Sequence, residues 1–162
     1  MPNWLQLMLD SLPTLLWAAF VFTAPLTLLS FVFGLIVGLA TALARLFGPK
    51  LLVAVASFYV WIFRGTPLLV QLFLIFYGLP SAGILLDAFT AALIGFTLNI
   101  GAYSSEIIRA VIASVPRGQW EAAYSIGMTW SQAMRRTILP QAARTAVPPL
   151  SNTFISLVKD TS

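Results

Sequence analysis

The fold class is decided near the start of the chain, where residues 11–44 read SLPTLLWAAFVFTAPLTLLSFVFGLIVGLATALA and contain no charged side chain. A membrane-spanning helix needs about 20 mostly apolar residues. As one helix, these 34 residues would be about 51 Å long at about 1.5 Å per residue, longer than one untilted span and too short for two spans with a turn. The stretch therefore predicts one membrane span with an apolar segment before it.

The composition of the whole chain agrees with this interpretation. Of its 162 residues, 59% are hydrophobic and 9% are charged, whereas soluble domains carry roughly 25% charged residues. Too few charges are present to cover a water-facing surface, so we predict an integral membrane protein. The chain has neither cysteine nor histidine, which argues against disulfide frameworks, metal cofactors and most hydrolytic chemistry.

The remaining uncharged runs predict further spans. They lie at 51–63, 65–86, 88–105 and 145–158. We expect spans near 20–43, 55–78 and 88–108, and the beginning of a fourth near 147–162. The predicted fold is therefore all-α, a polytopic bundle of transmembrane helices that forms a single domain over residues 1–162.

The segment 1–13 has its own pattern. Apolar residues recur there at helical spacing, at Trp4, Leu5, Met8, Leu9 and Leu12. This pattern predicts a short helix lying in the membrane interface and ending at Pro13. A secretory signal peptide is the alternative, but no Lys or Arg precedes the apolar run.

The distribution of basic residues predicts the orientation. Seven of the nine lie in two predicted loops, Arg45 and Lys50 in the first and Arg109 to Arg144 in the second. The positive-inside rule places both loops in the cytoplasm, and the N-terminus and residues 79–87 outside. Because the last apolar run reaches Ser162 while still inside the bilayer, we expect a fragment, with about four of five natural spans present.

Two pairs of residues predict contacts between or along the spans. Gly34 and Gly38 form a Gly-x-x-x-Gly pattern, which favours close helix packing. Glu106 and Arg109, three residues apart near the inner end of the third span, predict an ion pair.

The inner segment 116–140 is too polar to cross a membrane. Residues 119–126 predict a helix that ends at Gly127, and Thr129 with Gln132 forms a capping box for a second helix ending before Pro140. An apolar stripe at a spacing of four residues joins Ile126, Trp130, Met134 and Ile138 and has to be covered. One alternative is that both helices pack on their own bundle. The other is a DNA-binding helix-turn-helix. The flanking spans disfavour the helix-turn-helix, because they leave no scaffold to project a recognition helix.

The residues of this segment resemble the EAA loop of ABC importer permeases. The resemblance rests on Glu121-Ala122-Ala123, on Gly127 and on Thr137-Ile138-Leu139-Pro140, with Thr137 in place of an isoleucine often found there. In that family the loop forms a coupling helix that docks on a cytoplasmic ATPase. The resemblance implies a coupling role for Gly118, Trp120, Glu121, Ala122, Ala123, Gly127, Ile138, Leu139 and Pro140.

Further segments are similar to the polar amino-acid subfamily, which includes cystine, histidine and glutamine permeases. They are residues 63–71, Ala102-Tyr103 with Glu106 and Arg109, residues 118–120 and residues 156–162. The resemblance implies a five-span permease of the bacterial inner membrane that works by alternating access. It also implies a cytoplasmic ATPase dimer, an extracytoplasmic binding protein and a second permease subunit, identical or related, as partners.

No phosphate-binding loop of the Gly-x-x-x-x-Gly-Lys-Ser/Thr type occurs in the chain. We therefore expect a non-enzymatic transport subunit, with ATP hydrolysis on a separate chain. An autonomous channel or secondary transporter and a membrane-tethered DNA-binding regulator are the alternatives, distinguished by whether function depends on an ATPase or on DNA.

Polar residues within the spans mark a candidate substrate pathway, comprising Arg64, Gly65, Thr66, Pro67, Gln71, Asn99, Lys159 and Asp160. Pro67 frees the carbonyl of Phe63, so the second span should be broken there. Arg64 is expected either to reach the inner surface or to face the pathway. Lys159 and Asp160 point about 100° apart on a helix and need separate partners. Our hypothesis is that Asp160 receives the amino group of the substrate; the alternative is a pair holding two subunits together.

Overall fold

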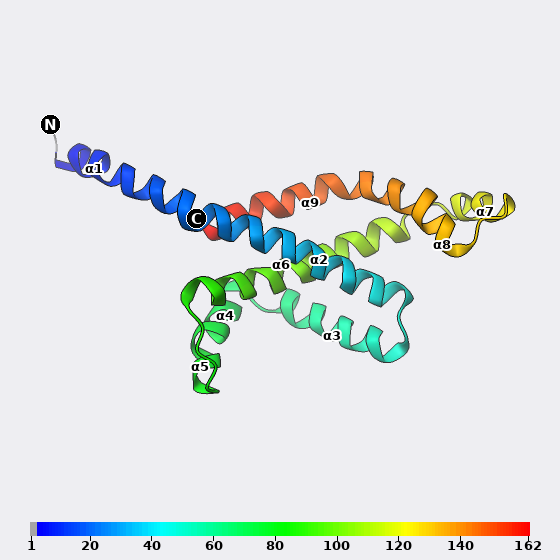
Figure 1. The fold of residues 1–162 in the computed structure, drawn as a ribbon, viewed down its shortest axis with the longest axis horizontal. Helices are drawn as coiled ribbons and strands as arrows, with labels where there is room; N and C mark the ends of the chain where they lie inside the picture. The colour runs from blue at the N-terminus through cyan, green and yellow to red at the C-terminus, as the bar shows by residue number, and fades with distance from the viewer. Residues whose placement is uncertain (1–2) are drawn as a thin grey trace.

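The structure, a computed structural model, describes residues 3–162 apart from the side chains of Asn3, Leu5, Leu7 and Leu9. Every regular element in this part of the chain is helical, as predicted, and three short π-helical turns (η) interrupt the α-helices (Figure 1). The elements are α1 (Asn3–Ala18), η1 (Ala19–Thr23), α2 (Ala24–Phe47), α3 (Lys50–Gly65), α4 (Leu68–Phe73), η2 (Leu74–Gly78), α5 (Leu79–Ser81), α6 (Ala88–Ala113), α7 (Arg117–Ser125), α8 (Trp130–Ala133), η3 (Met134–Ile138) and α9 (Leu139–Thr161).

The long apolar helices coincide with the predicted spans. Among the residues that the structure describes, two stretches are long and apolar enough to cross a membrane, Asp10–Phe47 and Ala88–Ala113. A third candidate is the pair Lys50–Gly65 and Leu68–Ser81, which meets at a break with a bend of 109°. The predicted fourth segment lies within α9, which begins at Leu139 instead of near residue 147.

The N-terminal helix is longer than the sequence predicts. The prediction that it ends at Pro13 is wrong, because α1 passes through Pro13 and leads through η1 into α2. In an apolar medium every backbone group needs an internal partner, so a continuous helix with one lost hydrogen bond costs less than an open end. Trp4, Met8 and Leu12 are exposed, and Leu5 and Leu9 lie outside the described side chains. The interfacial position of residues 1–13 stays a prediction.

The centre of the bundle is the contact between α2 and α6, made by glycines. A Cβ atom added to Gly34 would lie 2.6 Å from the Ile100 side chain, and one added to Gly38 would lie 2.8 Å from Cβ of Ser104. These distances are shorter than real Cβ contacts, so only glycine lets the two helices approach this closely. The predicted close packing is confirmed.

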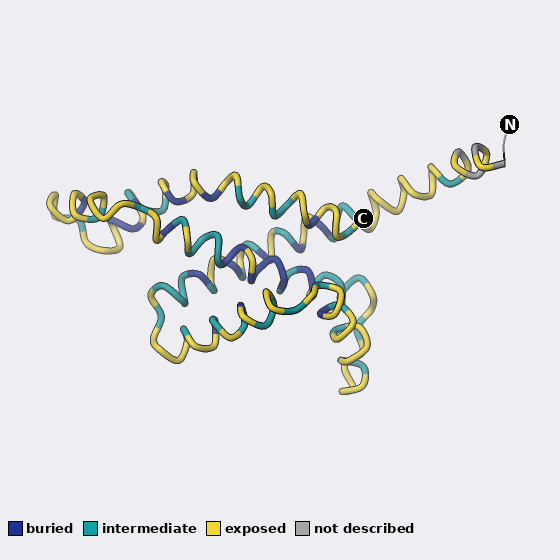
Figure 2. The backbone as a smooth tube through the Cα atoms, turned by 180° about the vertical axis from the view of Figure 1, so that it is seen from behind, coloured by how far each residue is buried: buried dark blue, intermediate teal, exposed yellow. Residues whose placement is uncertain are grey.

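The last helix, α9, completes the bundle along α6. Near the C-terminal end of α9, buried Leu157 packs with Phe96 and Ile100. Near its start, Ile138 and Ala142 pack with Ile112, which lies close to the other end of α6. Figure 2 shows the buried residues along the middle of the bundle, while the described part of α1 is largely exposed.

An N-terminal cap fixes the start of α6. The Asp87 carboxylate accepts hydrogen bonds from the hydroxyl group of Thr90 at 2.6 Å and from its backbone N–H at 3.0 Å. Both bonds favour the ionised form and hold the pKa of Asp87 below its usual value. The cap ends the loop of residues 82–87, and α6 begins at Ala88.

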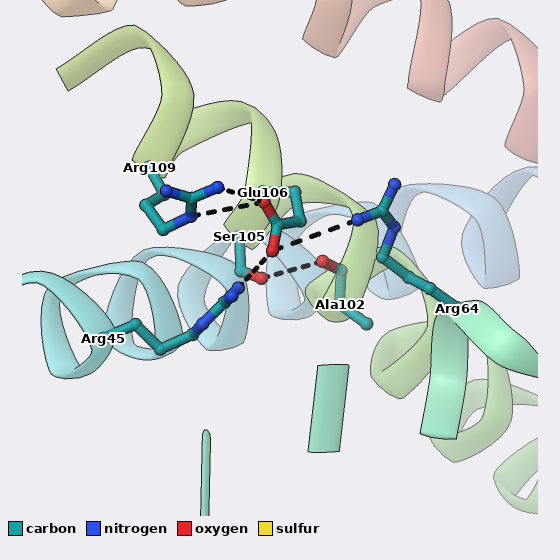
Figure 3. A network of polar contacts seen from close by, with 6 residues as sticks. All are labelled: Arg45, Arg64, Ala102, Ser105, Glu106 and Arg109. Atoms are coloured by element: carbon teal, nitrogen blue, oxygen red, sulfur yellow. Dashed lines mark hydrogen bonds and ion pairs between the residues drawn. The ribbon is translucent and has the colours of Figure 1, made fainter. Parts of the chain in front are cut away.

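A single carboxylate joins three helices at the other end of α6 (Figure 3). Glu106 forms an ion pair with Arg45 of α2 and one with Arg109 of its own helix, the latter at 2.8 Å. Arg64, at the end of α3, lies 3.9 Å from the same carboxylate and 5.5 Å from the centre of the Tyr103 ring. The predicted pair of Glu106 and Arg109 is confirmed, and the structure adds the two arginines from other helices.

Replacing Gly38 with alanine should loosen the contact between α2 and α6. The new methyl group would meet Ser104 Cβ and the backbone of Gly101 and Ser105, which cannot move away without shifting α6. We expect a loss of about 1–3 kcal/mol, visible as a lower unfolding temperature of the purified full-length protein in detergent. Gly78→Ala is the matched control, since nothing lies within 4 Å of a Cβ at that position. Equal unfolding temperatures for both variants would contradict the packing argument.

Replacing Glu106 with glutamine should destabilise the bundle by about 1–3 kcal/mol, because two charge-assisted contacts are lost and three arginines remain without their shared anion. Arg64→Gln serves for comparison. Its longer contact and its 45% exposed side chain predict a change below about 0.5 kcal/mol. The unfolding temperature measures the stability of both variants. A larger loss of stability in Arg64→Gln than in Glu106→Gln would overturn this ranking.

Candidate functional site

A polar pocket of about 270 Å³ lies where the break in the second span meets α6 and α9. The break supplies Thr66 and Pro67, and the neighbouring helices supply the other walls. The lining residues are Thr66, Pro67, Leu68, Asn99, Ile100, Tyr103, Thr153, Ser156 and Asp160. Five of them carry a hydroxyl, amide or carboxylate group that a small polar molecule could contact, in addition to the phenol of Tyr103.

The break has the local cause that the sequence predicts. Thr66 and Pro67 are in extended conformation between α3 and α4, with ψ values of 144° and 139°. The carbonyl of Phe63, left without its helical partner, accepts a hydrogen bond of 2.8 Å from the side-chain amide of Gln71. The predicted break at Pro67 is confirmed, and Gln71 satisfies the group that the proline frees.

The predicted pathway residues occupy different positions around this pocket. Thr66, Pro67, Asn99 and Asp160 line it. Gln71 is buried behind the break and bonds to Asn99, and Arg64 and Gly65 directly precede the break. Lys159 is exposed and is absent from the pocket walls, consistent with the predicted divergence of adjacent side chains on a helix.

The ion pairs do not include the two charges near the end of α9. Among residues 3–162, all three ion pairs use Glu106, so neither Lys159 nor Asp160 takes part in one. In the same part of the chain, no three acidic side chains come together as a metal site would require. The Asp160 carboxylate therefore faces the pocket as an unpaired acceptor.

Several pocket residues were missing from the sequence-based candidates. Thr153 and Ser156 precede Asp160 by seven and four residues, and this helical spacing places all three on one face of α9. That spacing was the available signal. The position of Tyr103 and Ile100 depends on how α6 packs against α3 and α9, which no local pattern contains.

The helix pair of the inner segment is formed largely as predicted. α7 ends before Gly127, whose φ of 79° is the left-handed conformation typical of a helix C-terminus. Thr129 and Gln132 form the expected capping box at the start of α8. The interpretation of two helices joined at a glycine is confirmed.

Two details of this segment differ from the prediction. The second helix does not end before Pro140 but continues from Trp130 to Thr161, because the π-helical turn η3 shifts the hydrogen-bond pattern directly before the proline. The apolar stripe is divided as well. Met134 and Ile138 are buried in the bundle, whereas Ile126 and Trp130 are 73% and 48% exposed. Packing on the chain's own bundle therefore covers the half of the stripe that is nearer the membrane.

The candidate coupling residues divide in the same way. Ala123 and Ile138 are buried, and Trp120 and Leu139 pack on the cluster around Ile112. Gly118, Glu121, Ala122, Gly127 and Pro140 are exposed. The exposed residues form the free surface of the helix pair, and the buried ones fix the pair to α6 and α9.

Known proteins with similar sequences are permeases. The family model described as "Binding-protein-dependent transport system inner membrane component" matches residues 30–162. The L-cystine transport system permease protein TcyB of Bacillus subtilis (strain 168) is 62% identical over 141 residues, covering 87% of this chain and 60% of that protein. TcyL of the same organism, also an L-cystine transport system permease protein, is 44% identical over 160 residues, covering 94% of this chain and 66% of that protein. The chain spans about three fifths of the length of TcyB.

Solved structures share the fold. The crystal structure of an amino acid ABC transporter with histidines matches with a TM-score of 0.87 and 42% identity, covering 96% of this chain and 72% of that chain. A structure of the MetNI methionine ABC transporter in an inward-facing conformation matches with a TM-score of 0.75 at 23% identity, covering 93% and 72%, and shows likeness of fold alone. From the match over residues 30–162 and the relatives, the chain belongs to the family of binding-protein-dependent transport system inner membrane components.

Proposed function

We propose that this chain forms the translocation pathway of an ATP-driven importer for polar amino acids, with cystine as the substrate to test first. The observation that carries the proposal is the polar pocket at the broken helix, whose lining includes the exposed Asp160 carboxylate, near the end of a helix that the proposal places within the membrane. A charge or polar group in such a position is costly unless it serves a function. TcyB and TcyL, named as L-cystine permeases, support the choice of cystine.

The partners follow from this proposal. A separate ATPase dimer supplies energy at the cytoplasmic face, and an extracytoplasmic binding protein delivers the substrate. A second permease subunit, identical or related, forms the other half of the pathway. ATP-driven closure of the ATPases pushes on the two coupling segments, and the pathway changes from inward-open to outward-open as a rigid-body motion.

The proposed orientation has the N-terminus outside the cytoplasm. The basic turn between α2 and α3 lies at the same end of the bundle as α7 and α8 (Figure 1), and the ion pairs of Glu106 tie Arg45 to Arg109 near that end. The positive-inside rule makes this end cytoplasmic. Residues 79–87 then lie on the outer side.

The ATPase contact is assigned to the exposed surface of α7 and to the turn after it. Glu121 and Ala122 are exposed on α7, and Tyr124, Ile126 and Trp130 add apolar area that the bundle leaves open. Exposed aromatic and aliphatic side chains next to charged ones are typical of a protein interface. Gly127 is exposed, and nothing else in the described part of the chain lies within 4 Å of a Cβ at that position, so the turn is open to a partner.

Replacing Glu121 with alanine should weaken docking of the ATPase. We expect an approximately tenfold loss of ATP-dependent cystine uptake in proteoliposomes and less ATPase retained during purification, because an exposed interface charge is removed while α7 keeps its helix. Asp10→Ala, which removes an exposed carboxylate on α1, is the control and should retain both uptake and association. Full uptake and full association of Glu121→Ala would refute the coupling role.

Replacing Asp160 with asparagine tests the pocket. The loss of a charge-assisted hydrogen bond to the substrate ammonium should raise KM for uptake by about tenfold to a hundredfold, with the subunits still assembled. Size-exclusion chromatography checks the assembly, and Asp10→Asn is the control. Unchanged KM in an intact complex would exclude the substrate role, and dissociation of the complex would favour the alternative that Asp160 holds two subunits together.

A further inference from the structure

Gln71 lies one turn into α4, and its amide group is almost completely buried, with 5% of the residue exposed. The residue does not line the pocket, yet it contacts the segment that does. Its nitrogen Nε2 lies 2.8 Å from the Phe63 carbonyl, 3.0 Å from the Thr66 carbonyl and 2.8 Å from the Thr66 hydroxyl. Its oxygen Oε1 accepts a hydrogen bond of 2.9 Å from the amide nitrogen of Asn99.

The chemistry of these partners allows only one orientation of the amide. Two of the three groups around Nε2 are backbone carbonyls, which accept hydrogen bonds and cannot donate them. Rotating the amide by 180° would place Oε1 against both carbonyl oxygens and Nε2 against the NH₂ group of Asn99. The break and Asn99 therefore hold the nitrogen of Gln71 toward Thr66.

This orientation fixes the hydrogen-bonding role of the Thr66 hydroxyl. Its single proton is donated to the Ile62 carbonyl at 2.8 Å, and one of its two lone pairs faces Nε2 of Gln71, whose two protons are shared among three acceptors. One lone pair is left. Because Thr66 lines the pocket, its hydroxyl can present only an acceptor to a molecule bound there.

Two further groups of the pocket also act as hydrogen-bond acceptors. The Thr153 hydroxyl donates its proton to the Pro149 carbonyl at 3.0 Å, which leaves lone pairs free. Asp160 contributes a carboxylate. Thr66, Thr153 and Asp160 thus present acceptors to the same pocket, alongside the hydroxyl groups of Ser156 and Tyr103. Such acceptors are complementary to a group that carries several N–H donors, such as an alkylammonium ion.

We propose that Gln71 is a positioning residue for substrate recognition. By holding the Thr66 hydroxyl as an acceptor, it adapts the pocket to an ammonium group without touching the substrate itself. This inference rests on the proposed function, since it assigns a residue to the recognition step of that transport. A purely structural role, in which Gln71 only closes the broken helix, would leave substrate affinity unchanged.

The test compares KM and the maximal rate of ATP-dependent L-cystine uptake by the full-length permease, assembled with its ATPase and binding protein in proteoliposomes. The variants are Gln71→Met, Thr66→Val and the double variant, with Thr66→Ser as the matched control that keeps the hydroxyl. We expect KM to rise by about fivefold to tenfold in each single variant, as for the loss of one hydrogen bond, and to stay near the wild-type value in Thr66→Ser. The double variant should resemble either single variant, because both remove the same interaction.

The unfolding temperatures of the wild type, the two single variants and the double variant provide a readout independent of substrate. Non-additive losses in Gln71→Met and Thr66→Val support the coupling between the two side chains, and additive losses overturn it. Should Gln71→Met not assemble, Gln71→Asn keeps an amide but is one methylene too short to reach Thr66, and it is expected to raise KM by a similar factor.

Different results would refute the proposed transport function and the positioning role of Gln71. Absence of ATP-dependent cystine uptake by the wild-type complex would refute cystine transport, and the unfolding temperatures would then decide on the coupling. Normal wild-type uptake with a reduced maximal rate but unchanged KM in Gln71→Met would retain the transport function and overturn the positioning role.

Discussion

In a lipid bilayer a helix can be interrupted only where other protein groups hydrogen-bond the backbone atoms that the interruption frees. The second span of this protein is broken at Thr66 and Pro67, and the side chain of Gln71 supplies the missing partners. Because Gln71 hydrogen-bonds the freed carbonyl groups from one side of the break, the other side remains open to a bound molecule. On that side lies the pocket, so the same constraint that limits irregular backbone in membranes also determines where a polar site can form.

The other features of the bundle hold this break in place. The glycines of α2 bring that helix against α6, and Tyr59 of α3 donates a hydrogen bond of 2.5 Å to the Leu98 carbonyl of α6. One residue further along α6, Asn99 reaches Gln71. Glu106, two turns further along α6, contacts arginines of α2, α3 and α6. Contacts with α6 thus fix the positions of α2, α3 and α4 relative to one another.

Local patterns predicted much of this arrangement. Uncharged runs located the spans, Pro67 located the break, and the Thr129 and Gln132 capping box located a helix start, because each depends on residues that are near in sequence. The continuation of helices through Pro13 and Pro140 was not predicted. In both cases the cost of opening a helix end exceeds that of one lost hydrogen bond, and a π-helical turn adjusts the pattern before Pro140. The division of the apolar stripe and the place of Tyr103 in the pocket depend on packing between distant segments, which no local pattern specifies.

A continuous helical stretch from Trp130 to Thr161, made of α8, η3 and α9, links the two regions that the transport proposal joins. Its 32 residues extend about 48 Å at about 1.5 Å per residue. Half-exposed Trp130 lies at one end, next to the turn after α7, and Asp160 near the other end lines the pocket. No flexible loop lies between the two ends, so a movement of one end is transmitted to the other. The helix can therefore act as a lever arm, and its pivot is expected near Pro148 and Pro149, where two successive residues lack the N–H groups that stiffen the rest.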